Sequence, residues 1–298
     1  MEATRLKRMG VLYGAVLILF TAYLLLDTFV IPRSYAPVST ETAEPLPDSA
    51  FETEEDLSEF DYHDAHIRVK LSEYREYDTD IYVAEVFLSS AEYLKAGFAK
   101  NTYGKNVKQT VSEMAEASGA ILAINGDYYG SRETGYVLRN GILYRDKRDK
   151  TCTDLVITED GDFVFLPEKD NPAATLTEMG AWQAFSFGPP LVENGEVTVG
   201  RHDEVLHALA SNPRTGIGIV EPLHYFFVVS DGRTKESAGL SLYQFGCFMQ
   251  SLGVSAAYNM DGGGSSTLVF LDEVLNVPTS DGVSIEERSV SDFVYIGY

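Results

Sequence analysis

The amino-acid sequence predicts an α+β domain with a large mixed, mostly antiparallel sheet and a few packed helices, preceded by one N-terminal transmembrane helix. From residue 67 onward, short runs rich in β-branched and aromatic residues alternate with turn residues, which is typical of strands. Asn140-Gly141 and Asp160-Gly161 each separate two such runs, as hairpin turns do. We therefore expect most strands to pair in antiparallel fashion.

The transmembrane helix is predicted from residues 9–26, an uncharged apolar run of 18 residues, which is just long enough to cross a bilayer. Three basic residues precede this run, so the positive-inside tendency places the N-terminus in the cytoplasm and the rest of the chain outside. We expect residues 1–33 to form the cytoplasmic tip and an uncleaved anchor. A small-x-small sequence ends at Ala36, and cleavage after it is left open.

Residues 34–66 are expected to form an acidic, disordered linker, because they contain ten acidic residues and no Lys or Arg. The body of the protein is then residues 67–298. The net charge of the whole chain is −22, and the sequence contains no basic stripe of the kind that binds a phosphate backbone. A nucleic-acid partner is therefore excluded.

Two helices have clear boundaries in the body. The first begins at a capping box on Thr110 and ends at Gly119, and the second begins at a capping box on Ser241 and ends at Gly253. Each helix leads into a buried strand and then into a polar glycine turn. Rigid scaffolds commonly present reactive groups at such strand ends.

The turn after the second helix contains Asp261 and three glycines in succession, which lose more backbone entropy on ordering than any other tripeptide. Bare backbone can bring several N–H groups against an anion. Asp261 would repel an anion, so we expect it to act as a base or a nucleophile, or to bind a metal or sugar hydroxyls. The remaining contacts of this loop are expected from Gly262, Gly263, Gly264, Ser265 and Ser266.

Other candidate residues have a structural alternative. Arg214 begins a strand and suits a phosphate or carboxylate ligand, unless it forms a surface salt bridge. Arg288 has the same two interpretations, and Asp231 lies in a turn after an apolar strand. Asn125 and Asp127 lie beside two tyrosines, a combination that favours either sugar binding or core packing.

Seven segments stand in a fixed order along the body: NGDYY, SFGPPLVENG, NPRTGIGI, VVSDGR, GLSLYQF, NMDGGGSSTLVF and ERSVSDF. This ordered set resembles the phosphodiester glycosidase family over roughly residues 100–298. The chain differs from the usual family pattern at Asp127, Tyr129, Met260 and Ser289. Asp127 is the difference that could alter the choice of substrate.

The resemblance implies an α+β domain that hydrolyses a sugar-1-phosphodiester and frees the sugar from a phosphomonoester. Because a phosphomonoester is a good leaving group, stabilising the anion and placing the water or nucleophile become the main tasks. The phosphate would be held by Arg214, Arg288 and the glycine loop, which is residues 262–264. Either Asp261 or Asp231 would act at the anomeric carbon. The remaining polar residues would hold hydroxyls or orient a carboxylate: Asn125, Asp127, Ser265 and Ser266.

The expected function is that of a membrane-anchored, extracytoplasmic glycosidase acting on sugar-1-phosphodiester or related cell-surface and exopolysaccharide linkages. The alternatives are a non-catalytic glycan-binding or exopolysaccharide assembly protein, or a carboxylate-based hydrolase of another polymer. The expected partners are a glycan and, through the N-terminal helix, the membrane. The sequence specifies no cofactor, and a divalent cation, with Ca²⁺ as the candidate, stays open. Cys152 and Cys247 are the only cysteines, and whether they form a disulfide is undecided.

Overall fold

The computed structural model describes residues 2–39, 44–51, 57–201 and 210–298. It confirms the α+β class, and every strand pair among the described residues is antiparallel. The strands form one eight-stranded sheet, two five-stranded sheets and a two-stranded ribbon, where the sequence suggested one large mixed sheet. Strongly twisted open sheets rarely exceed about ten strands without splitting, which accounts for the difference.

The eight-stranded sheet is buried on both faces near its middle. Helix α4 (Leu242–Ser251) packs on one face, and the other face contributes to the core shared with the remaining sheets. Gly218 permits this close packing, because a methyl group there would lie 2.9 Å from the Met249 side chain. The strand order is β14 (Glu196–Val197), β13 (Pro190–Glu193), β17 (Ala256–Asn259), β15 (Arg214–Glu221), β16 (His224–Ser230), β4 (Thr79–Leu88), β3 (Ile67–Glu76) and β2 (Tyr62–His63).

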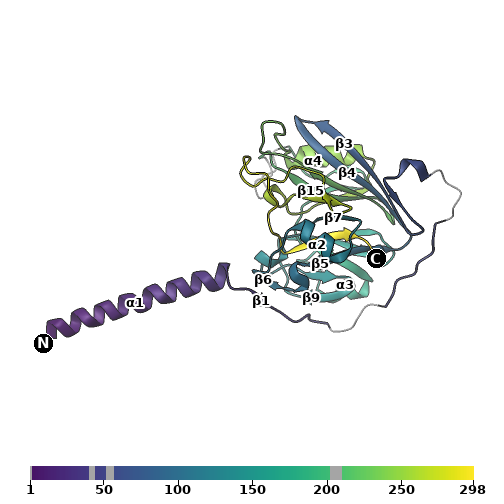
Figure 1. Cartoon of the computed structure of the whole chain (residues 1–298). Helices are drawn as coiled ribbons and strands as arrows, with labels where there is room; N and C mark the ends of the chain where they lie inside the picture. Colours follow the sequence, from purple (N-terminus) through teal and green to yellow (C-terminus); the bar gives the residue numbers. More distant parts are fainter. Residues whose placement is uncertain (1, 40–43, 52–56, 202–209) are drawn as a thin grey trace.

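The two five-stranded sheets lie beside one another below the large sheet in Figure 1. One contains, in spatial order, β19 (Glu273–Val274), β18 (Leu268–Phe270), β7 (Leu122–Asn125), β20 (Asp292–Ile296) and β5 (Leu94–Phe98). The other contains β11 (Phe163–Pro167), β10 (Thr153–Thr158), β12 (Ala181–Phe185), β8 (Val137–Arg139) and β9 (Ile142–Arg145). The main hydrophobic cluster draws side chains from all three sheets, so they form a single core.

Short elements complete the body. Helix α2 (Val111–Ser118) packs on the β7 sheet, and α3 (Ala174–Glu178) packs on β12. The two-stranded ribbon pairs β1 (Arg33–Ser34) with β6 (Gly104–Lys105). The 3₁₀ helices are η1 (Leu57–Glu59), η2 (Ala91–Tyr93), η3 (Ala99–Asn101), η4 (Tyr129–Ser131) and η5 (Gly263–Ser265).

The local predictions are largely confirmed. Both capping boxes are present, and Gly119 ends α2 in the left-handed conformation. Helix α4 ends at Ser251, two residues before the expected stop. Asn140 and Gly141 both have positive φ, as a two-residue hairpin turn requires, whereas the loop at Asp160 is longer, with Thr158 donating to the carbonyl of Asp162.

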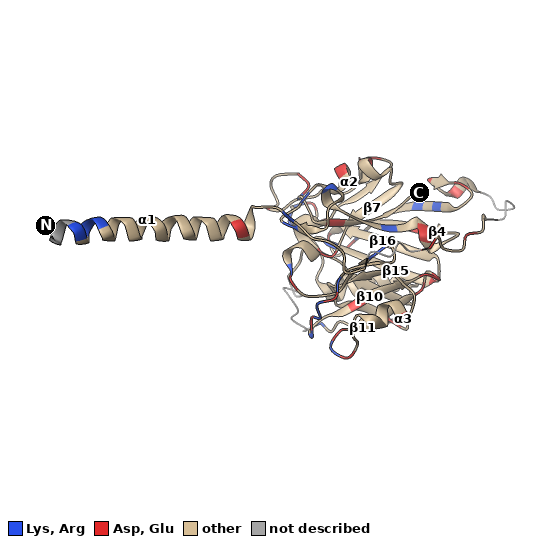
Figure 2. Ribbon diagram, turned by 90° about the horizontal axis from the view of Figure 1, so that it is seen from below, with Lys and Arg blue, Asp and Glu red and all other residues tan. Residues whose placement is uncertain are grey.

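The N-terminal helix α1 (Glu2–Phe29) extends away from the body (Figure 1). It is the one helix among the described residues that is long and apolar enough to cross a membrane, a test that a signal sequence also passes. Figure 2 shows its charged residues confined to the two ends. The helix extends beyond the predicted apolar run of residues 9–26 at both ends, and its first turns carry the basic residues.

The described parts of residues 34–66 contact the body, which differs from the expected solvated linker. Leu46 is buried against Trp182, and Asp48 accepts a hydrogen bond of 2.6 Å from the Tyr93 hydroxyl. Strand β2 joins the edge of the eight-stranded sheet. The acidic composition predicts that the segment is solvated, but it does not show that one apolar side chain, Leu46, packs against the body. Glu41 and residues 52–56 lie outside the described residues, and the predicted boundaries at residues 33 and 66 stay predictions.

Candidate active site

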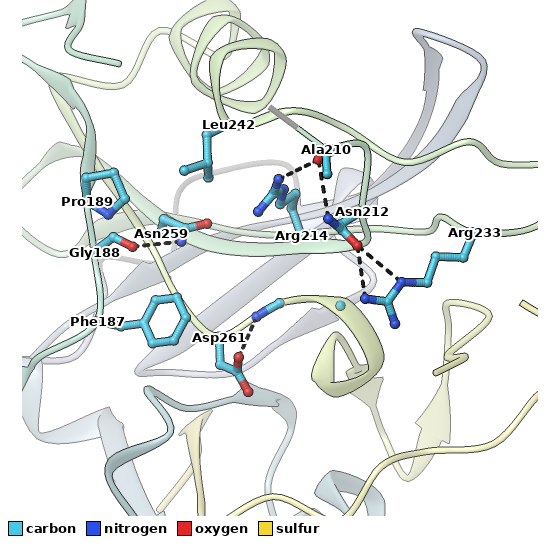
Figure 3. Close-up of a pocket in the computed structure, with 12 residues that line it drawn as sticks. Phe187, Gly188, Pro189, Ala210, Asn212, Arg214, Arg233, Leu242, Asn259 and Asp261 are labelled. Carbon is cyan, nitrogen blue, oxygen red and sulfur yellow. Dashed lines mark hydrogen bonds between the residues drawn. The ribbon is translucent and has the colours of Figure 1, made fainter. Parts of the chain in front are cut away.

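A cavity of about 370 Å³ opens where several strand ends of the large sheet meet the start of α4 (Figure 3). Strand β15 begins at Arg214 on its wall, and β17 ends at Asn259, two residues before Asp261. The cavity is lined by Phe187, Gly188, Pro189, Ala210, Asn212, Arg214, Arg233, Leu242, Asn259, Asp261, Gly262 and Gly263. The chain thus brings together five of the seven sequence segments: SFGPPLVENG, NPRTGIGI, VVSDGR, GLSLYQF and NMDGGGSSTLVF.

Arg214 is held rigidly at the wall of this cavity. Its Nε donates to the Leu240 carbonyl at 2.8 Å, and its Nη2 donates to the Ala210 carbonyl at 2.9 Å. Only 7% of the residue is exposed. Burial, together with the positive charge of Arg233, lowers the pKa of Arg214 to about 10, so the guanidinium still carries its charge at neutral pH.

Arg233 approaches the same cavity from the turn after β16. Asn212 orients it, because the Asn212 side-chain oxygen accepts from both Nε and Nη2 of Arg233, at 3.2 and 2.9 Å (Figure 3). A third cation is near, since burial and the charge of Arg288 lower the pKa of Arg233. Three arginines therefore converge on one region, which we call the arginine cluster: Arg214, Arg233 and Arg288.

The glycine loop packs directly against two arginines of this cluster, Arg233 and Arg288. A methyl group at Gly263 would lie 2.8 Å from Arg233 Nη2, and one at Gly264 would lie 2.7 Å from Arg288 Nη2. Gly263 also has φ +63°, which other residues rarely adopt. The loop therefore requires glycine because guanidinium groups approach the backbone closely.

The backbone of this loop offers fewer donors than the sequence suggested. The N–H of Gly262 donates to the Asp261 carboxylate at 2.9 Å, and the N–H of Gly263 donates to the Pro213 carbonyl at 2.8 Å. Only Gly264 has an N–H without an acceptor among the described hydrogen bonds. The positive charge of the cavity therefore comes mainly from arginine side chains.

Asp261 is the one carboxylate that lines the cavity among the described residues. Burial raises the pKa of its carboxyl, while the Gly262 N–H and the charge of Arg288 act in the opposite direction. Its backbone carbonyl accepts from Asn125 Nδ2 at 2.6 Å, which anchors the start of the loop to β7. The group is thus a positioned acid or base with a shifted pKa, as active sites commonly have.

Asn259 contributes an unsatisfied acceptor. Its Nδ2 donates to the Gly188 carbonyl at 2.9 Å, while its buried Oδ1 has no hydrogen-bond partner among the described residues. Figure 3 shows this oxygen on the side facing Arg214. A buried polar atom without a partner is costly, so a donor from a ligand, such as a sugar hydroxyl, would satisfy it.

The structure places Asn125 behind the cavity rather than on its lining. Its side-chain oxygen accepts from the Thr215 hydroxyl at 2.9 Å and from the Thr267 N–H at 3.3 Å. The residue therefore links β7, β15 and the glycine loop. This is a positioning role, one of the two that the sequence suggested for it.

Asp127 is also removed from the cavity lining. It is fully buried, accepts from the Ser186 N–H at 2.8 Å and pairs with Arg139 at 3.0 Å; Arg139 pairs with Asp292 at the same distance. Burial alone would raise the pKa of Asp127, but Arg139 and the Ser186 N–H hold it below its usual value. The core-packing interpretation of this residue fits these contacts better than direct substrate contact.

Asp231 lies behind the cavity as well. Its Oδ1 accepts from the Val277 N–H at 2.8 Å and from Asn276 Nδ2 at 3.3 Å, and Asn276 also donates to the Ser266 carbonyl at 3.0 Å. Burial raises the pKa of Asp231. The carboxylate thus tethers the segment that supports the glycine loop, and Asp261 is better placed to meet a ligand.

Ser265 and Ser266 are buried beneath the loop and do not line the cavity. The Ser265 hydroxyl helps to lower the pKa of the Asp261 carboxyl, which fits the predicted role of orienting a carboxylate, while the Ser266 hydroxyl has no hydrogen-bond partner among the described residues. Sequence reasoning missed Phe187, Asn212, Arg233 and Asn259 as lining residues. All four lie within the quoted segments, and this position in the sequence is the feature that could have indicated them.

Among the described residues, no group of three or more His, Cys, Asp or Glu side chains gathers as metal ligands would. The structure adds nothing in favour of the Ca²⁺ alternative at this cavity. Cys152 and Cys247 are both free, so they do not form the disulfide that the sequence left open.

The fold and the cavity define an α+β domain whose site combines two lining arginines, a third arginine behind the glycine loop and one buried carboxylate. The model of the phosphodiester glycosidase family matches residues 118–297, which is more than half of the chain. The chain belongs to this family. The family resemblance predicted from the sequence is thereby confirmed over most of its range.

Two solved structures share the fold. The catalytic domain of zebrafish N-acetylglucosamine-1-phosphodiester alpha-N-acetylglucosaminidase, auto-inhibited by its pro-peptide, superposes with a TM-score of 0.63 at 18% identity, covering 85% of this chain and 88% of that one. A hypothetical protein from Synechocystis gives a TM-score of 0.58 at 13% identity, covering 78% and 62%. These likenesses show the fold.

A sequence relative is the SPbeta prophage-derived uncharacterized protein YomE of Bacillus subtilis. It is 29% identical over 203 residues, which is 66% of this chain and 31% of that protein. The chain thus spans about a third of the length of this relative.

Proposed function

We propose that the protein is a membrane-anchored glycosidase, with its body outside the cytoplasm, that hydrolyses sugar-1-phosphodiester linkages of cell-surface or exopolysaccharide glycans. The observation that carries this proposal is the convergence of the arginine cluster on the loop that holds Asp261. Family membership supports the reaction class.

The arginine cluster suits the phosphate. Burial and a neighbouring guanidinium lower the pKa values of both Arg214 and Arg233, so these arginines repel one another at this site. A phosphodiester anion relieves this repulsion, and a planar guanidinium can donate two parallel hydrogen bonds to phosphate oxygens. Arg214 and Arg233 line the cavity, while Arg288 adds its charge from behind Gly264.

Asp261 is assigned as the general base. It takes a proton from a water whose oxygen bonds to the anomeric carbon as the bond from that carbon to the phosphate oxygen breaks. The phosphomonoester leaves as an anion held by the arginines, so a second carboxylate acting as a strong acid is unnecessary. This assignment predicts inversion at the anomeric carbon, because water attacks from the side opposite the leaving group.

The sugar has its own contacts in the cavity. Phe187 offers an apolar face, and the unpaired Oδ1 of Asn259 accepts from a hydroxyl. Pockets of this kind combine apolar walls with a few fixed polar groups that set the orientation of the ligand. A sugar held by these contacts would have its anomeric carbon between Asp261 and the arginines.

Anchoring is supported by α1, whose basic residues precede an apolar stretch long enough to cross a bilayer. The positive-inside tendency then places the body on the outer side. Extracytoplasmic glycans would be the substrates that such a body meets.

The test uses the full chain in detergent with a panel of sugar-1-phosphodiesters, following reducing sugar and phosphomonoester with and without a chelator. We expect both products in equal amounts, unaffected by the chelator. Asp261→Asn should lower kcat by about 10²- to 10⁴-fold, the range that a positioned base supplies. Arg214→Ala should lower kcat/KM by about 30-fold or more, because it removes a buried charged partner of the phosphate.

Absence of turnover across the panel, with glycan binding retained by Asp261→Asn, would contradict the proposal and favour the glycan-binding or exopolysaccharide assembly alternative. Activity that disappears with the chelator would instead show a cation-dependent site. Arg75→Gln is the matched control, because it removes one exposed positive charge held by Asp80 at 2.7 Å in the β3–β4 hairpin.

A further inference from the structure

We propose that a second cavity binds an anionic sugar unit, so that the substrate is an anionic glycan chain occupying two cavities at once. This inference rests on the proposed function for the identity of the substrate, but the binding site itself does not depend on turnover. The second cavity has a volume of about 400 Å³. We call it the tyrosine-lined cavity, after Tyr35, Tyr103, Tyr129 and Tyr144 on its wall.

The aromatic wall is a preformed platform. Tyr103 and Tyr129 are stacked with ring centroids 5.3 Å apart, and Tyr144 packs 5.1 Å from Tyr103. Tyr129, from the NGDYY segment, is fixed further because its hydroxyl accepts from the Gly104 N–H at 3.2 Å. Tyr129 is buried behind the wall, while the exposed ring of Tyr35 and the partly exposed rings of Tyr103 and Tyr144 offer apolar surface with polar edges, which suits the mixed surface of a sugar.

Arg145 supplies a buried positive charge at this cavity. Its Nε donates to the Gly135 carbonyl, and its Nη1 donates to the carbonyls of Tyr129 and Arg132 at 3.1 and 2.8 Å. Within residues 2–39, 44–51, 57–201 and 210–298, no carboxylate lies within ion-pair distance of it, and its Nη2 makes none of the hydrogen bonds found there. The residue is only 9% exposed.

A buried charge without a counter-ion is expensive, so a ligand that brings an anion would stabilise this site. The acid whose charge raises the pKa of Arg145 is Asp127, which is already paired with Arg139. Two further carboxylates line the cavity, Glu133, which pairs with Lys105 at 3.4 Å, and Asp146. Burial lowers the pKa of Arg145, in agreement with incomplete compensation. Carboxylate and phosphate both match the guanidinium.

Arg132 connects the two cavities. It lines the tyrosine-lined cavity, and its guanidinium lies 5.0 Å above the ring of Phe187, which lines the first cavity. Its Nη1 donates to the Ser186 carbonyl at 2.6 Å, and its charge also reaches Asp261. A glycan with one linkage at Asp261 would therefore extend past Arg132 toward Arg145.

The N-terminal segment completes the tyrosine-lined cavity. The Tyr35 N–H donates to the Tyr103 carbonyl at 2.9 Å, and Asn106 Nδ2 donates to the carbonyls of Thr28 and Ile31 at 3.2 and 3.1 Å. The body is thereby attached at the end of α1, and Figure 1 shows β1, β6 and β9 at this junction. The cavity thus lies beside the predicted membrane anchor, where a surface polymer would arrive.

The test is calorimetric titration of the full chain in detergent with oligosaccharides of equal length that carry phosphate, carboxylate or no charge. We expect the anionic oligomers to bind at least about tenfold more tightly than the neutral one, because a charge-assisted hydrogen bond to a buried group is worth at least this much. The phosphate and carboxylate arms identify the preferred anion. Arg145→Gln should abolish the preference for anionic over neutral oligomers. Tyr35→Ala should weaken binding of all three oligomers by about fivefold or more, because one aromatic contact is lost. Arg75→Gln should change neither the preference nor the affinities.

Equal binding of charged and neutral oligomers by the unaltered chain would overturn the inference, as would unchanged affinity in Arg145→Gln. If circular dichroism shows that Arg145→Gln does not fold, Tyr35→Ala decides, and unchanged affinity there overturns the inference. Hydrolysis separates this inference from the proposed function. A short sugar-1-phosphodiester should be cleaved equally by the unaltered chain and by Arg145→Gln, whereas selective anion binding without any cleavage would contradict only the proposed function.

Discussion

Gly262, Gly263 and Gly264 show at the residue scale why the loop after β17 has its composition. Gly263 and Gly264 leave room for guanidinium groups, Gly262 lies against the Pro213 carbonyl, and the charge of Arg288 acts on Asp261. Glycine in this loop therefore serves close packing of the side chains around it as much as it supplies backbone donors. Substitutions within it should affect the arginines before they affect the backbone.

Gly264→Ala tests this interpretation. The added methyl group would collide with Ser280 Oγ and lie 2.7 Å from Arg288 Nη2, so this hydrogen-bonded pair of side chains must move. We expect a loss of about 1–3 kcal/mol in the free energy of unfolding, typical of overpacking, together with a raised KM for the phosphodiester. Denaturant unfolding and steady-state kinetics measure the two effects. Unchanged values for both would show that Arg288 does not constrain the loop.

The pH dependence of activity follows from the pKa of Asp261. Burial raises this pKa, and the charge of Arg288 opposes the rise, so Arg288→Gln should raise the pKa further. Because the base must be deprotonated, the acidic limb of the kcat/KM profile should shift to higher pH in this variant. A pH–rate profile measures it, with Arg75→Gln as control. A shift to lower pH would contradict the assignment of Asp261 as the base.

At the scale of elements, the short N-terminal segments matter more than their length suggests. Leu46 fills a groove against Trp182, while Asp48 binds the Tyr93 hydroxyl and strand β2 covers part of the edge of the large sheet. Exposed strand edges invite pairing with other chains, so β2 protects the edge it covers. These contacts join the predicted linker to the body.

A chain beginning at residue 67 should therefore be less stable than one beginning at residue 44. Burial of Leu46 alone is worth about 1.5–3 kcal/mol, and β2 and Asp48 add to it. Chemical denaturation of the two chains compares their free energies of unfolding. Equal stability would mean that the segment contributes no net stabilisation in solution.

At the scale of the whole molecule, the ion-pair network of Asp127, Arg139 and Asp292 joins the two five-stranded sheets. Two buried carboxylates share one guanidinium. Burial and the neighbouring Asp127 raise the pKa of Asp292 to about 7, while Asp127 keeps a lowered pKa. Between about pH 4 and about pH 7, Asp292 therefore keeps a proton in the folded protein, while the same residue has lost its proton in the unfolded chain.

This network predicts how stability changes with pH. Between the ordinary pKa of aspartate, about 4, and the value of about 7 in the fold, the folded state holds more protons, so the contribution of Asp292 to stability falls as pH rises. Asp292→Asn should remove this decline, whereas the loss below about pH 4 due to Asp127 should persist. Thermal or denaturant unfolding from about pH 2 to about pH 8 measures both effects. An identical decline in the variant would contradict the assignment.

Sequence reasoning was most successful where structure depends on neighbouring residues. The capping boxes on Thr110 and Ser241 and the hairpin at Asn140 are set by local chemistry, and all three are found. Asp127 shows the limit of this reasoning. Its partners Arg139 and Asp292 come from other strands, and no local pattern indicates that a buried arginine will neutralise it.

The candidate site shows the same division. The ordered segments located Arg214 and Asp261 on one cavity, but they did not separate lining residues from supporting residues such as Asn125 and Asp231. That distinction depends on which way a side chain points after the sheets pack. Arg233 was overlooked because Asp231, two positions earlier, carries the more obvious chemistry.

The central claim is that water attacks the anomeric carbon and that the phosphomonoester leaves intact. Hydrolysis of a sugar-1-phosphodiester by the full chain in ¹⁸O-labelled water tests it directly, with the product phosphate read by the isotope shift in its ³¹P NMR signal. We predict an unlabelled phosphomonoester, because the bond between the anomeric carbon and oxygen is the one that breaks. A labelled phosphate would show attack at phosphorus and would contradict the account.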